Sequence, residues 1–378
     1  MIDLQQTFSQ KAFLVALDVD GKKGDASTGT LEELALLLEN LGITVAGKSI
    51  QRRSGPDPRY FVGSGKAQFI RAEAMDLQAG LIVVDGILSP GQAAALTRLV
   101  GLPVWDRPLV IMKVFEDRAQ TEEAKLQVEL ARCRYEIPFL KGLGLQMSRP
   151  GGGVGTRGPG ETEFERHRRK LARRIREINK KIEAIRNRRE NQRKRRVRAG
   201  LSTVALVGYT NSGKSTLLKR LSGDRDLYVA DQLFSTLDPF VRRVLLEKGD
   251  PVLFTDTVGF IRNLPPALVT AFRATLEEIT AADLIILVAD ATSGRFEEDM
   301  AVVEETLASI EAGALPRIIA LNKIDRLDTE TVENLRTLAG CSGDRVVAIS
   351  ALLGDHTPEL LEAVEEMLFS SRKEEWGD

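Results

Sequence analysis

The chain has 378 residues, which is enough for two or three domains with apolar cores of their own. Its composition, 43% apolar and 28% charged, is that of a globular protein and excludes wholesale disorder. The net charge of −1 predicts no partner by itself.

Cysteine, histidine and hydropathy patterns exclude several classes of protein. Cys133 and Cys341 lie far apart without C-x-x-C spacing, so neither a zinc site nor a disulfide framework is predicted. His167 and His356 offer no metal cluster. No apolar run approaches the roughly 18 residues of a membrane helix, and the N-terminus lacks the basic-then-apolar pattern of a signal peptide. We expect a cytoplasmic protein with no membrane-spanning segment.

The first hundred residues alternate between strand and helix patterns. The expected strands are Ala12–Asp18, Ile43–Ala46, Leu81–Asp85 and Pro103–Asp106, and the expected helices are Leu31–Leu41, Ala93–Val100 and one that follows residues 58–66. This alternation predicts a small parallel α/β domain over residues 1–107. Gly63-Ser-Gly-Lys66 resembles a phosphate loop but lacks its spacing, so a turn at a helix start is favoured over a second nucleotide site.

Residues 108–200 predict an antiparallel helical hairpin. Leu126, Leu130, Cys133 and Ile137 form an apolar stripe on a helix expected over about residues 108–138. On the second helix the apolar side chains recur at coiled-coil a/d spacing. They are Phe164, Leu171, Ile175, Ile178, Ile182 and Ile185.

The second helix of this hairpin is strongly basic. Residues 161–200 hold 17 Lys and Arg and 6 Asp and Glu, a local balance of +11, so the rest of the chain sums to −12. A projecting basic helix suits a polyanion, and we expect RNA contact; a merely solvated charged face is the alternative. The candidate RNA-binding residues here are Arg193, Lys194, Arg195 and Arg196.

A glycine-rich stretch over residues 142–162 is expected as the loop of the hairpin. Its Gly153-Val-Gly-Thr-Arg-Gly158 is a formal G-x-G-x-x-G, but no strand precedes it, so a dinucleotide fold is rejected. Arg149 and Arg157 among bare backbone could hold an RNA phosphate chain, and a plain flexible linker is the alternative.

Residues 208–216 match the phosphate-loop pattern G-x-x-x-x-G-K-[ST] in full. The apolar strand Ser202–Val207 precedes the loop and the helical Thr216–Leu221 follows it, which is the context that the motif needs. Lys214 is then placed to reach the β- and γ-phosphates, and Ser215 to reach Mg²⁺. The loop residues expected to bind nucleotide are Gly208, Asn211, Ser212, Gly213, Lys214, Ser215 and Thr216.

Two further stretches predict the metal and γ-phosphate contacts of a GTPase. Within residues 231–239, Thr236 is expected to bring a hydroxyl to Mg²⁺, with Ser235 as the rival. The strand Pro251–Thr255 leads into Asp256-Thr-Val-Gly259, where the carboxylate suits Mg²⁺ and the glycine N–H can approach the γ-phosphate. The expected catalytic residues are Lys214, Thr236, Asp256 and Gly259, of which Thr236 and Asp256 join Ser215 as metal-site residues; no general base is identifiable.

We expect the guanine base to be bound by residues that follow two of the strands. Asn322-Lys-Ile-Asp325 follows the strand Arg317–Leu321, and a carboxylate there can accept both hydrogen bonds from the guanine edge, which adenine cannot donate. Asn322 would hold the loop, and the Lys323 stem would lie over the purine. A last strand over 346–349 precedes Ser350 and Ala351, which suit the base oxygen.

Two residues bear on the mechanism of hydrolysis. Phe260 stands where Ras-like GTPases carry a water-orienting glutamine, so we expect slow intrinsic turnover that rises when a partner completes the site. Asn211 matches the position at which potassium-stimulated GTPases hold a monovalent cation. K⁺ is therefore a candidate cofactor beside Mg²⁺, and simple bracing of the loop is the alternative.

Together these pieces resemble the HflX-type GTPases of the Obg–HflX group over nearly the whole chain. The marks are Arg59–Lys66, Leu126–Leu130, Arg157–Thr162 and Asp256–Arg262. The resemblance implies a ribosome-associated GTPase. We expect a monomer with a Ras-like domain over residues 201–378. Its α/β domain and hairpin would engage the rRNA of the large subunit near the peptidyl-transferase region.

The resemblance further implies that the protein splits stalled or idle ribosomes and that the ribosome stimulates its hydrolysis. We also expect that DNA is not a partner. Because the chain ends soon after the last motif, no further C-terminal domain is expected. Two alternatives stay open: a GTPase that acts on another RNA or assembly factor, and an ATPase whose basic arm is purely structural.

Overall fold

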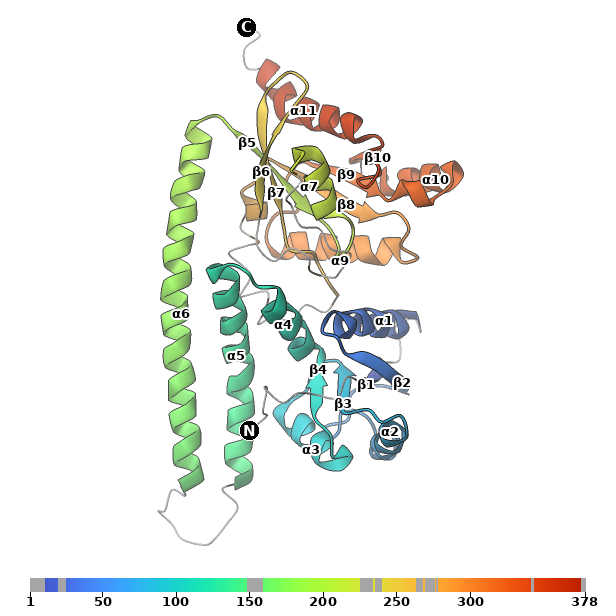
Figure 1. The fold of residues 1–378 in the computed structure, drawn as a ribbon, viewed down its shortest axis with the longest axis vertical. Helices are drawn as coiled ribbons and strands as arrows, with labels where there is room; N and C mark the ends of the chain where they lie inside the picture. Colours follow the sequence, from blue (N-terminus) through green and yellow to red (C-terminus); the bar gives the residue numbers. More distant parts are fainter. Residues whose placement is uncertain are drawn as a thin grey trace. The chain divides into compact units, whose positions relative to one another are not determined.

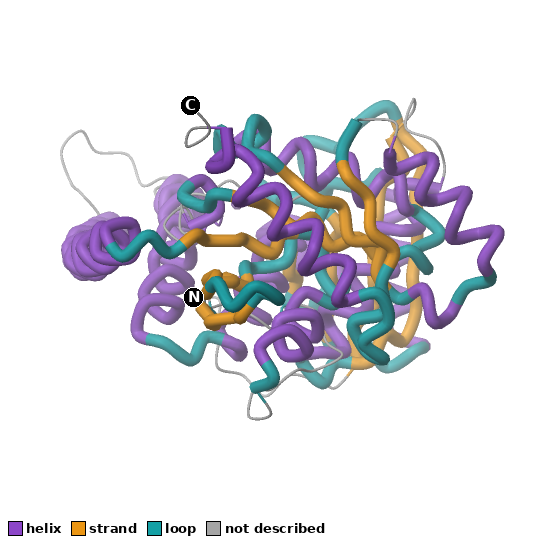
Figure 2. Tube along the Cα trace, turned by 90° about the horizontal axis from the view of Figure 1, so that it is seen from above, coloured by secondary structure: helices purple, strands orange, loops and turns teal. Residues whose placement is uncertain are grey.

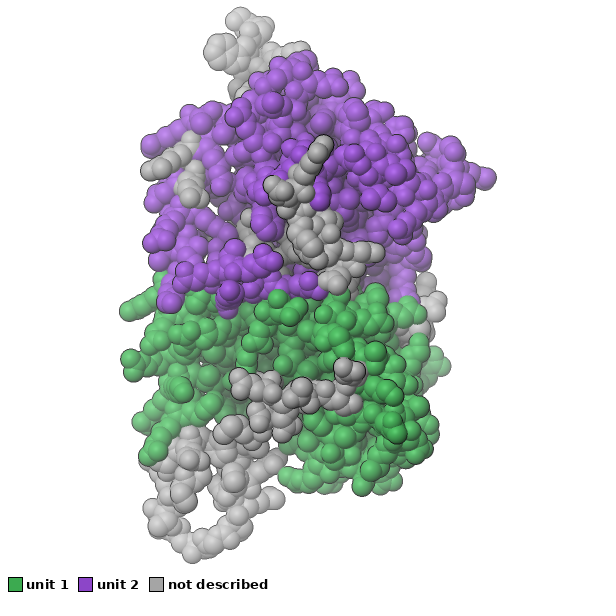
Figure 3. All heavy atoms as spheres, in the orientation of Figure 1, with its two compact units in different colours: residues 1–117, 126–180 green, residues 118–125, 181–378 purple. Residues whose placement is uncertain are grey.

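The structure is a computed structural model. It describes residues 11–19, 25–147, 159–224, 234, 240–262, 268, 276, 278–340 and 343–374, without the side chains of 25–28, 141–147, 159–164, 192, 195, 197 and 370–374. The chain forms two compact units (Figure 3). Unit 1 comprises Met1–Asp117 with Leu126–Lys180, and unit 2 comprises Arg118–Lys125 with Lys181–Asp378. The three-domain division expected from the sequence remains a prediction.

Unit 1 contains the predicted parallel α/β sheet (Figure 1). Its strands β1 (Lys11–Val19), β2 (Thr44–Arg53), β3 (Leu81–Asp85) and β4 (Val104–Asp106) pair in the order β2-β1-β3-β4. They alternate along the chain with α1 (Asp25–Asn40), α2 (Ser64–Asp76) and α3 (Pro90–Val100). All three strand pairings are parallel. The predicted small parallel α/β domain is therefore confirmed, although β2 runs well beyond the expected Ile43–Ala46.

Helices cover both faces of this sheet. On one face Phe13, Val15 and Ile82 pack into an apolar cluster with the buried side of α2 and with α3. The intervening strand residues, such as Leu14 and Val83, are equally buried on the opposite face, where Figure 1 places α1. Strands buried on both faces explain the continuous apolar runs in the sequence. Gly63 precedes the first residue of α2 as its N-cap, so the helix-start interpretation of residues 63–66 is confirmed.

The prediction of a single helix over residues 108–138 is wrong. The structure has α4 (Arg107–Arg118) and α5 (Glu122–Met147) with a break between them. At the break the Thr121 hydroxyl accepts a hydrogen bond from Ala124 N (3.1 Å) and so caps a new helix. The apolar pattern on both sides of the break hid it, and Pro138, which ended the predicted helix, lies inside α5.

The bounds of the glycine-rich loop are also wrong. Helix α5 continues to Met147, and α6 (Pro159–Arg198) begins before the expected loop end at residue 162. Figure 2 views α6 nearly end-on and shows it leading through a short loop into the next strand. The positions between the two helices, including Arg149 and Arg157, lie outside the described residues.

The α5 and α6 helices pack through the predicted apolar stripes. Within unit 1, Leu130 and Ile178 are buried, and Arg174 donates to both carboxylate oxygens of Glu129 at 2.6 and 2.8 Å. Within unit 2, Arg189 pairs with Glu123 at 2.7 Å. The stripe positions from Leu171 to Ile185 are buried or partly buried, and most of the described basic side chains of α6 are exposed. Among the described residues, no helix has the length and apolarity to cross a membrane.

A buried carboxyl at the end of β4 makes the stability of unit 1 depend on pH. Asp106 accepts hydrogen bonds from Leu88 N (3.2 Å), Leu109 N (3.0 Å) and the Tyr135 hydroxyl (2.9 Å). Burial nevertheless raises the pKa of Asp106 to about 6, because desolvation outweighs these hydrogen bonds.

We expect this carboxyl to lower the free energy of unfolding as pH rises from about 4 to about 6. The folded state holds the proton more tightly than the unfolded state does, so the loss should approach about 3 kcal/mol. Asp106→Asn should remove this component. The measurement is urea unfolding of both proteins across this pH range, in a Trp376→Phe background so that Trp105 reports on unit 1. Parallel pH profiles for the two proteins would contradict the expectation.

Unit 2 contains a sheet of six strands in the order β10-β9-β8-β5-β7-β6. The strands are β5 (Ser202–Val207), β6 (Val241–Leu245), β7 (Pro251–Asp256), β8 (Leu284–Asp290), β9 (Arg317–Asn322) and β10 (Arg345–Ala348). All pairings are parallel except that of β6 with β7. The carboxyl ends of the five parallel strands therefore meet at one edge of the sheet, where ligands of open α/β folds bind.

Two helical layers cover the unit 2 sheet (Figure 1). On one face α7 (Lys214–Ser222) and α11 (Thr357–Glu374) pack against Val204, Leu206 and Ile286. On the other face α9 (Phe296–Ser309) and α10 (Thr329–Gly340) pack against Val207 and Leu287. The predicted Ras-like P-loop architecture is confirmed, with strands and helices at the phosphate loop where the sequence placed them.

Candidate functional site

The phosphate loop turns from β5 into α7 at two glycines that no other residue could replace without strain. Gly208 has φ 151°, and a Cβ there would lie 2.2 Å from the Val288 carbonyl oxygen. Gly213 has φ 95° and is the N-cap of α7, with no side chain capping it. The first N–H groups of α7 thus stay available to an anion, and the helix dipole favours negative charge there.

Lys214 lies at the centre of this loop. Its Nζ donates to the carbonyl oxygens of Gly208 (3.1 Å) and Tyr209 (2.7 Å), and the side chain is buried. Burial lowers the pKa of Lys214 to about 8, and the nearby Asp256 carboxylate only partly opposes the shift. Nucleotide phosphates at the loop would strengthen the charged form, so this lysine is suited to bind them.

Ser215 and Asp256 bring two oxygen donors together. The Ser215 hydroxyl donates to Asp256 Oδ2 at 2.6 Å, and both residues are buried. A hydroxyl and a carboxylate at the base of a phosphate loop are the oxygen ligands that Mg²⁺ prefers. The residues present therefore fit a magnesium ion shared with nucleotide phosphates. Thr236 and its rival Ser235, the expected third contributors, lie outside the described residues.

The segment after Asp256 is joined to the phosphate loop by backbone pairing. Phe260 N donates to Gly208 O at 3.0 Å, and Thr210 N donates to Phe260 O at 2.8 Å. A Cβ on Gly259 would lie 2.9 Å from the Thr210 Cα and 3.1 Å from the Lys214 Nζ. Only glycine lets the chain pass so close to the lysine.

The Phe260 side chain turns away from this pairing. It is 3% exposed and packs in the apolar cluster with Ala205 and Leu276. A buried ring cannot orient a water molecule, so the described residues place no glutamine-like group directly after Gly259.

Asn322 connects the two halves of the site. Its Nδ2 donates to Ser212 O in the phosphate loop (2.8 Å), and its Oδ1 accepts from Ala351 N (2.9 Å). The side chain is 2% exposed. A Cβ on Gly213 would lie 2.2 Å from this same amide nitrogen. The strand end of β9, the phosphate loop and the loop after β10 are thus held as one structure.

The remaining predicted base-binding residues lie beside this connection. The Ser350 hydroxyl donates to Asp325 Oδ1 at 2.7 Å. Lys323, at φ 69°, pairs through its Nζ with Asp290 Oδ2 at 2.6 Å. This pairing fixes the lysine stem next to the β8 strand end, where a purine held by Asp325 would lie against it.

Asn211 occupies the left-handed region at φ 61° and is exposed. Asparagine tolerates this conformation well, which suits the loop-bracing role. Its exposed amide also suits the monovalent-cation role.

Sequence reasoning missed Arg220. From the phosphate-loop helix α7 its guanidinium donates to Leu352 O and to Ala351 O (3.4 Å). Gly354, at φ 93°, passes close to the same guanidinium, 3.4 Å from where a Cβ would lie. No local signal marks this arginine, because its partners lie far along the chain.

We expect Arg220→Ala to speed GDP dissociation about five- to tenfold, because the loop that carries Ser350 and Ala351 loses its hydrogen bonds to α7. Stopped-flow release of a fluorescent guanine nucleotide measures this rate. Arg336→Ala removes an exposed arginine that pairs with Glu333 and is the control. Equal release rates from both variants would rule out a bracing role for Arg220.

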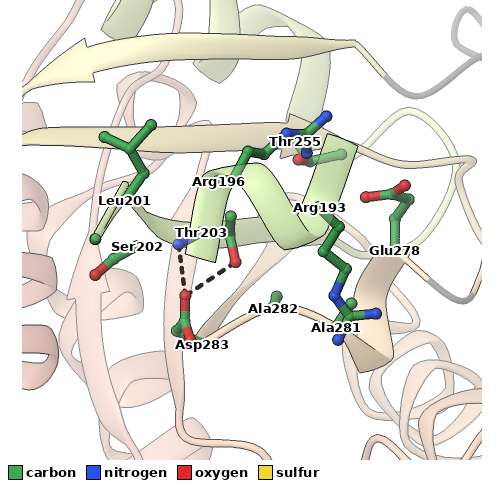
Figure 4. A pocket seen from close by; sticks show the side chains of 11 residues that line it. Arg193, Arg196, Leu201, Ser202, Thr203, Thr255, Glu278, Ala281, Ala282 and Asp283 are labelled. Carbon is green, nitrogen blue, oxygen red and sulfur yellow. Dashed lines mark hydrogen bonds between the residues drawn. The ribbon is translucent and has the colours of Figure 1, made fainter. Parts of the chain in front are cut away.

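A cavity of about 210 Å³ lies inside unit 2 where α6 joins the sheet (Figure 4). Arg193 and Arg196, two of the candidate RNA-binding residues, line it with Glu278 and Asp283. Asp283 accepts hydrogen bonds from Thr203 N (2.7 Å) and the Thr203 hydroxyl (3.0 Å), which fixes the start of β5.

Of the other two predicted RNA-binding residues near this cavity, Lys194 pairs with Glu190 at 2.8 Å, whereas the Arg195 side chain is not described. The end of the basic helix and the first residues of β5 thus line one cavity.

Family models cover most of the chain. A model described as "GTP-binding GTPase N-terminal" matches residues 28–116, and "GTP-binding GTPase Middle Region" matches residues 118–196. A third, described as "50S ribosome-binding GTPase", matches residues 203–323. Their order follows that of the elements described above.

Curated relatives and a solved structure extend this likeness. A GTPase HflX of Caldanaerobacter subterraneus is 41% identical over 95% of this chain and 81% of its own length. A GTPase HflX of Escherichia coli is 41% identical over 91% of this chain and 80% of its own. A crystal structure of the SsGBP and GDP complex aligns with a TM-score of 0.53 at 26% identity, covering 96% of this chain and 99% of that one.

Proposed function

The chain belongs to the HflX family of GTPases, and from this premise we propose that it binds the large ribosomal subunit through its basic arm and couples this contact to GTP hydrolysis. We further propose that the coupled cycle splits stalled or idle ribosomes. The family assignment argues against the ATPase alternative.

The charge of α6 carries the proposal. Residues 161–200 have a balance of +11 in a chain whose net charge is −1. Some of these cations are paired, for example Arg168 and Arg169 with Glu165. Others, including Arg176, Lys180 and Arg188, are exposed and have no acidic partner among the described residues. Unpaired cations along a helix attract a phosphate backbone and release its counterions.

The site supports slow hydrolysis that a partner accelerates. Lys214 would hold the phosphates, and Ser215 with Asp256 would hold Mg²⁺, whose charge stabilises the transferred phosphoryl group. Since Phe260 is buried in the core, water must be positioned by other groups. We propose that ribosome contact supplies this positioning, and that K⁺ at Asn211 adds positive charge near the phosphates.

Two measurements on the 378-residue chain test the proposal. Purified large subunits should co-sediment with the protein in a non-hydrolysable GTP analogue and less so in GDP. Hydrolysis should rise when subunits are added, and more in K⁺ than in Na⁺. Equal pelleting with any RNA and no nucleotide dependence would favour the alternative of a GTPase that acts on another RNA.

Matched arm variants locate the contact. Changing Arg176, Lys180 and Arg188 together to Gln removes unpaired cations and should lower the salt dependence of subunit binding by roughly 0.7–0.9 in log–log slope per lost phosphate contact. Changing Arg168, Arg169 and Arg173 to Gln removes the same charge from residues already paired with glutamates, so its effect should be smaller. If both triple variants lose the same amount of salt dependence, subunit binding depends on the net charge of the arm and not on which arginines and lysines are unpaired.

A further inference from the structure

A second concentration of positive charge lies in unit 1, apart from the basic arm. Residues 48–71 hold six Lys and Arg and a single acidic residue, Asp57, a balance of +5. This stretch runs from the exposed edge strand β2 through a tight turn into α2. The mechanism of nucleotide hydrolysis uses none of it.

Two of these cations lie over aromatic rings. The Arg59 guanidinium is 5.0 Å from the centroid of Tyr60, and the Lys66 Nζ is 4.6 Å from that of Phe69. Phe69 is 48% exposed, which is unusual for a phenylalanine in a folded unit. We call these four residues the cation–aromatic surface.

The turn that carries the first pair is held firmly. Asp57 Oδ1 accepts hydrogen bonds from Arg59 N (2.9 Å) and Tyr60 N (3.0 Å), and Asp57 and Phe61 form a backbone bridge. These bonds lower the pKa of Asp57. The single acidic residue of the stretch is thus engaged in the turn and with Arg53 at 3.7 Å. The Arg59 charge also helps to lower the pKa of Asp57, but no ion pair within 4.0 Å joins the Arg59 or Lys66 side chain to a carboxylate among the described residues.

We propose that the cation–aromatic surface binds unpaired nucleotides of RNA, with bases stacked on the rings and phosphates at the cations. The inference rests on the proposed function only in naming ribosomal RNA as the source of these nucleotides. The exposed Phe69 ring suits a base that has left a helix, because a base within a duplex has no free face to stack. Tyr60 is half-buried against the apolar cluster of unit 1, so it offers only part of its ring. The adjacent cations stabilise a stacked base and neutralise its phosphate.

The combination fits RNA better than an acidic protein. An acidic segment of a protein needs cations but gains little from an exposed ring. A nucleotide can use both a ring and a cation that lie about 5 Å apart, as in these two pairs. Rings already stacked under a cation are also held in fixed orientation, which lowers the entropy lost on binding.

The test measures binding of the full-length protein to a labelled unstructured 12-nucleotide RNA and to a duplex of the same strand. Phe69→Leu should weaken single-strand binding about tenfold and leave duplex binding unchanged. Lys66→Gln should weaken both and reduce the salt slope by about 0.7. Met75→Ala removes another exposed apolar side chain from α2 and controls for the loss of apolar surface in Phe69→Leu. Lys11→Gln removes a positive charge at the start of β1, where it pairs with the start of β2, and controls for the loss of charge in Lys66→Gln.

The outcomes separate this surface from the proposed function. If Phe69→Leu binds both RNAs as the wild type does, or if polyglutamate displaces the RNA at equal charge, the surface proposal is overturned while subunit co-sedimentation can still succeed. If Phe69→Leu loses single-strand binding but the wild type never pellets with large subunits, the surface stands and the ribosomal function fails. Circular dichroism of each variant confirms that unit 1 is folded.

Discussion

Asp325→Asn is expected to reverse the nucleotide preference of this GTPase from GTP to XTP. Guanine presents two donors, N1–H and the 2-amino group, and a carboxylate can accept both. An asparagine accepts only one and directs its own N–H at the other. Leaving a polar edge mismatched costs enough to lower GTP affinity by roughly 10³-fold or more. Xanthine has a carbonyl at position 2, which the asparagine N–H can satisfy.

The geometry around Asp325 makes this result specific. Ser350 donates to Asp325 Oδ1, and an asparagine oxygen can still accept that bond, so the loop should keep its shape. Asp328→Asn is the matched control, because Asp328 accepts hydrogen bonds from the backbone N and hydroxyl of Thr331 and lies outside the base contacts. Calorimetric titration with GTP, XTP and ATP gives the three affinities. Unchanged GTP binding in Asp325→Asn would remove Asp325 from the base site.

Local motifs explain why so much of unit 2 could be predicted. A phosphate loop is fixed by neighbours in sequence, and the conformations of Gly208 and Gly213 are those that the pattern requires. Strands buried on both faces are visible as unbroken apolar runs. The two residues that bear on the mechanism of hydrolysis, Phe260 and Asn211, could be found in the same way, because each is a single position within a motif.

Contacts between distant segments could not be predicted in the same way. Arg220 reaches the loop after β10 only because α7 and that loop are neighbours in the fold. The break before Thr121 left no gap in the apolar period, so a single long helix fitted the sequence equally well. Pro138 gave the opposite error, because α5 tolerates a residue that usually ends a helix.

Gly213→Ala is expected to abolish nucleotide binding while the rest of the protein stays folded. A Cβ at Gly213 would lie 2.2 Å from the Asn322 Nδ2, a distance that forces one of them to move. If Asn322 moves, it gives up its hydrogen bonds to Ser212 O and from Ala351 N together. The phosphate loop and the base loop would then lose their common support, and GDP affinity should fall by more than about 100-fold.

Gly223→Ala separates this collision from backbone strain. Gly223 ends the same helix at φ 66° with nothing within 4 Å of a Cβ, so the substitution should cost only about 1 kcal/mol of stability and leave GDP affinity nearly unchanged. Adding Asn322→Ala to Gly213→Ala removes the colliding amide, so the double variant should bind only slightly worse than Asn322→Ala alone, by the strain of an alanine at φ 95°. If it binds much worse, strain at Gly213 and not the collision controls the site, and Asn322 does not link the two loops in the way its hydrogen bonds indicate.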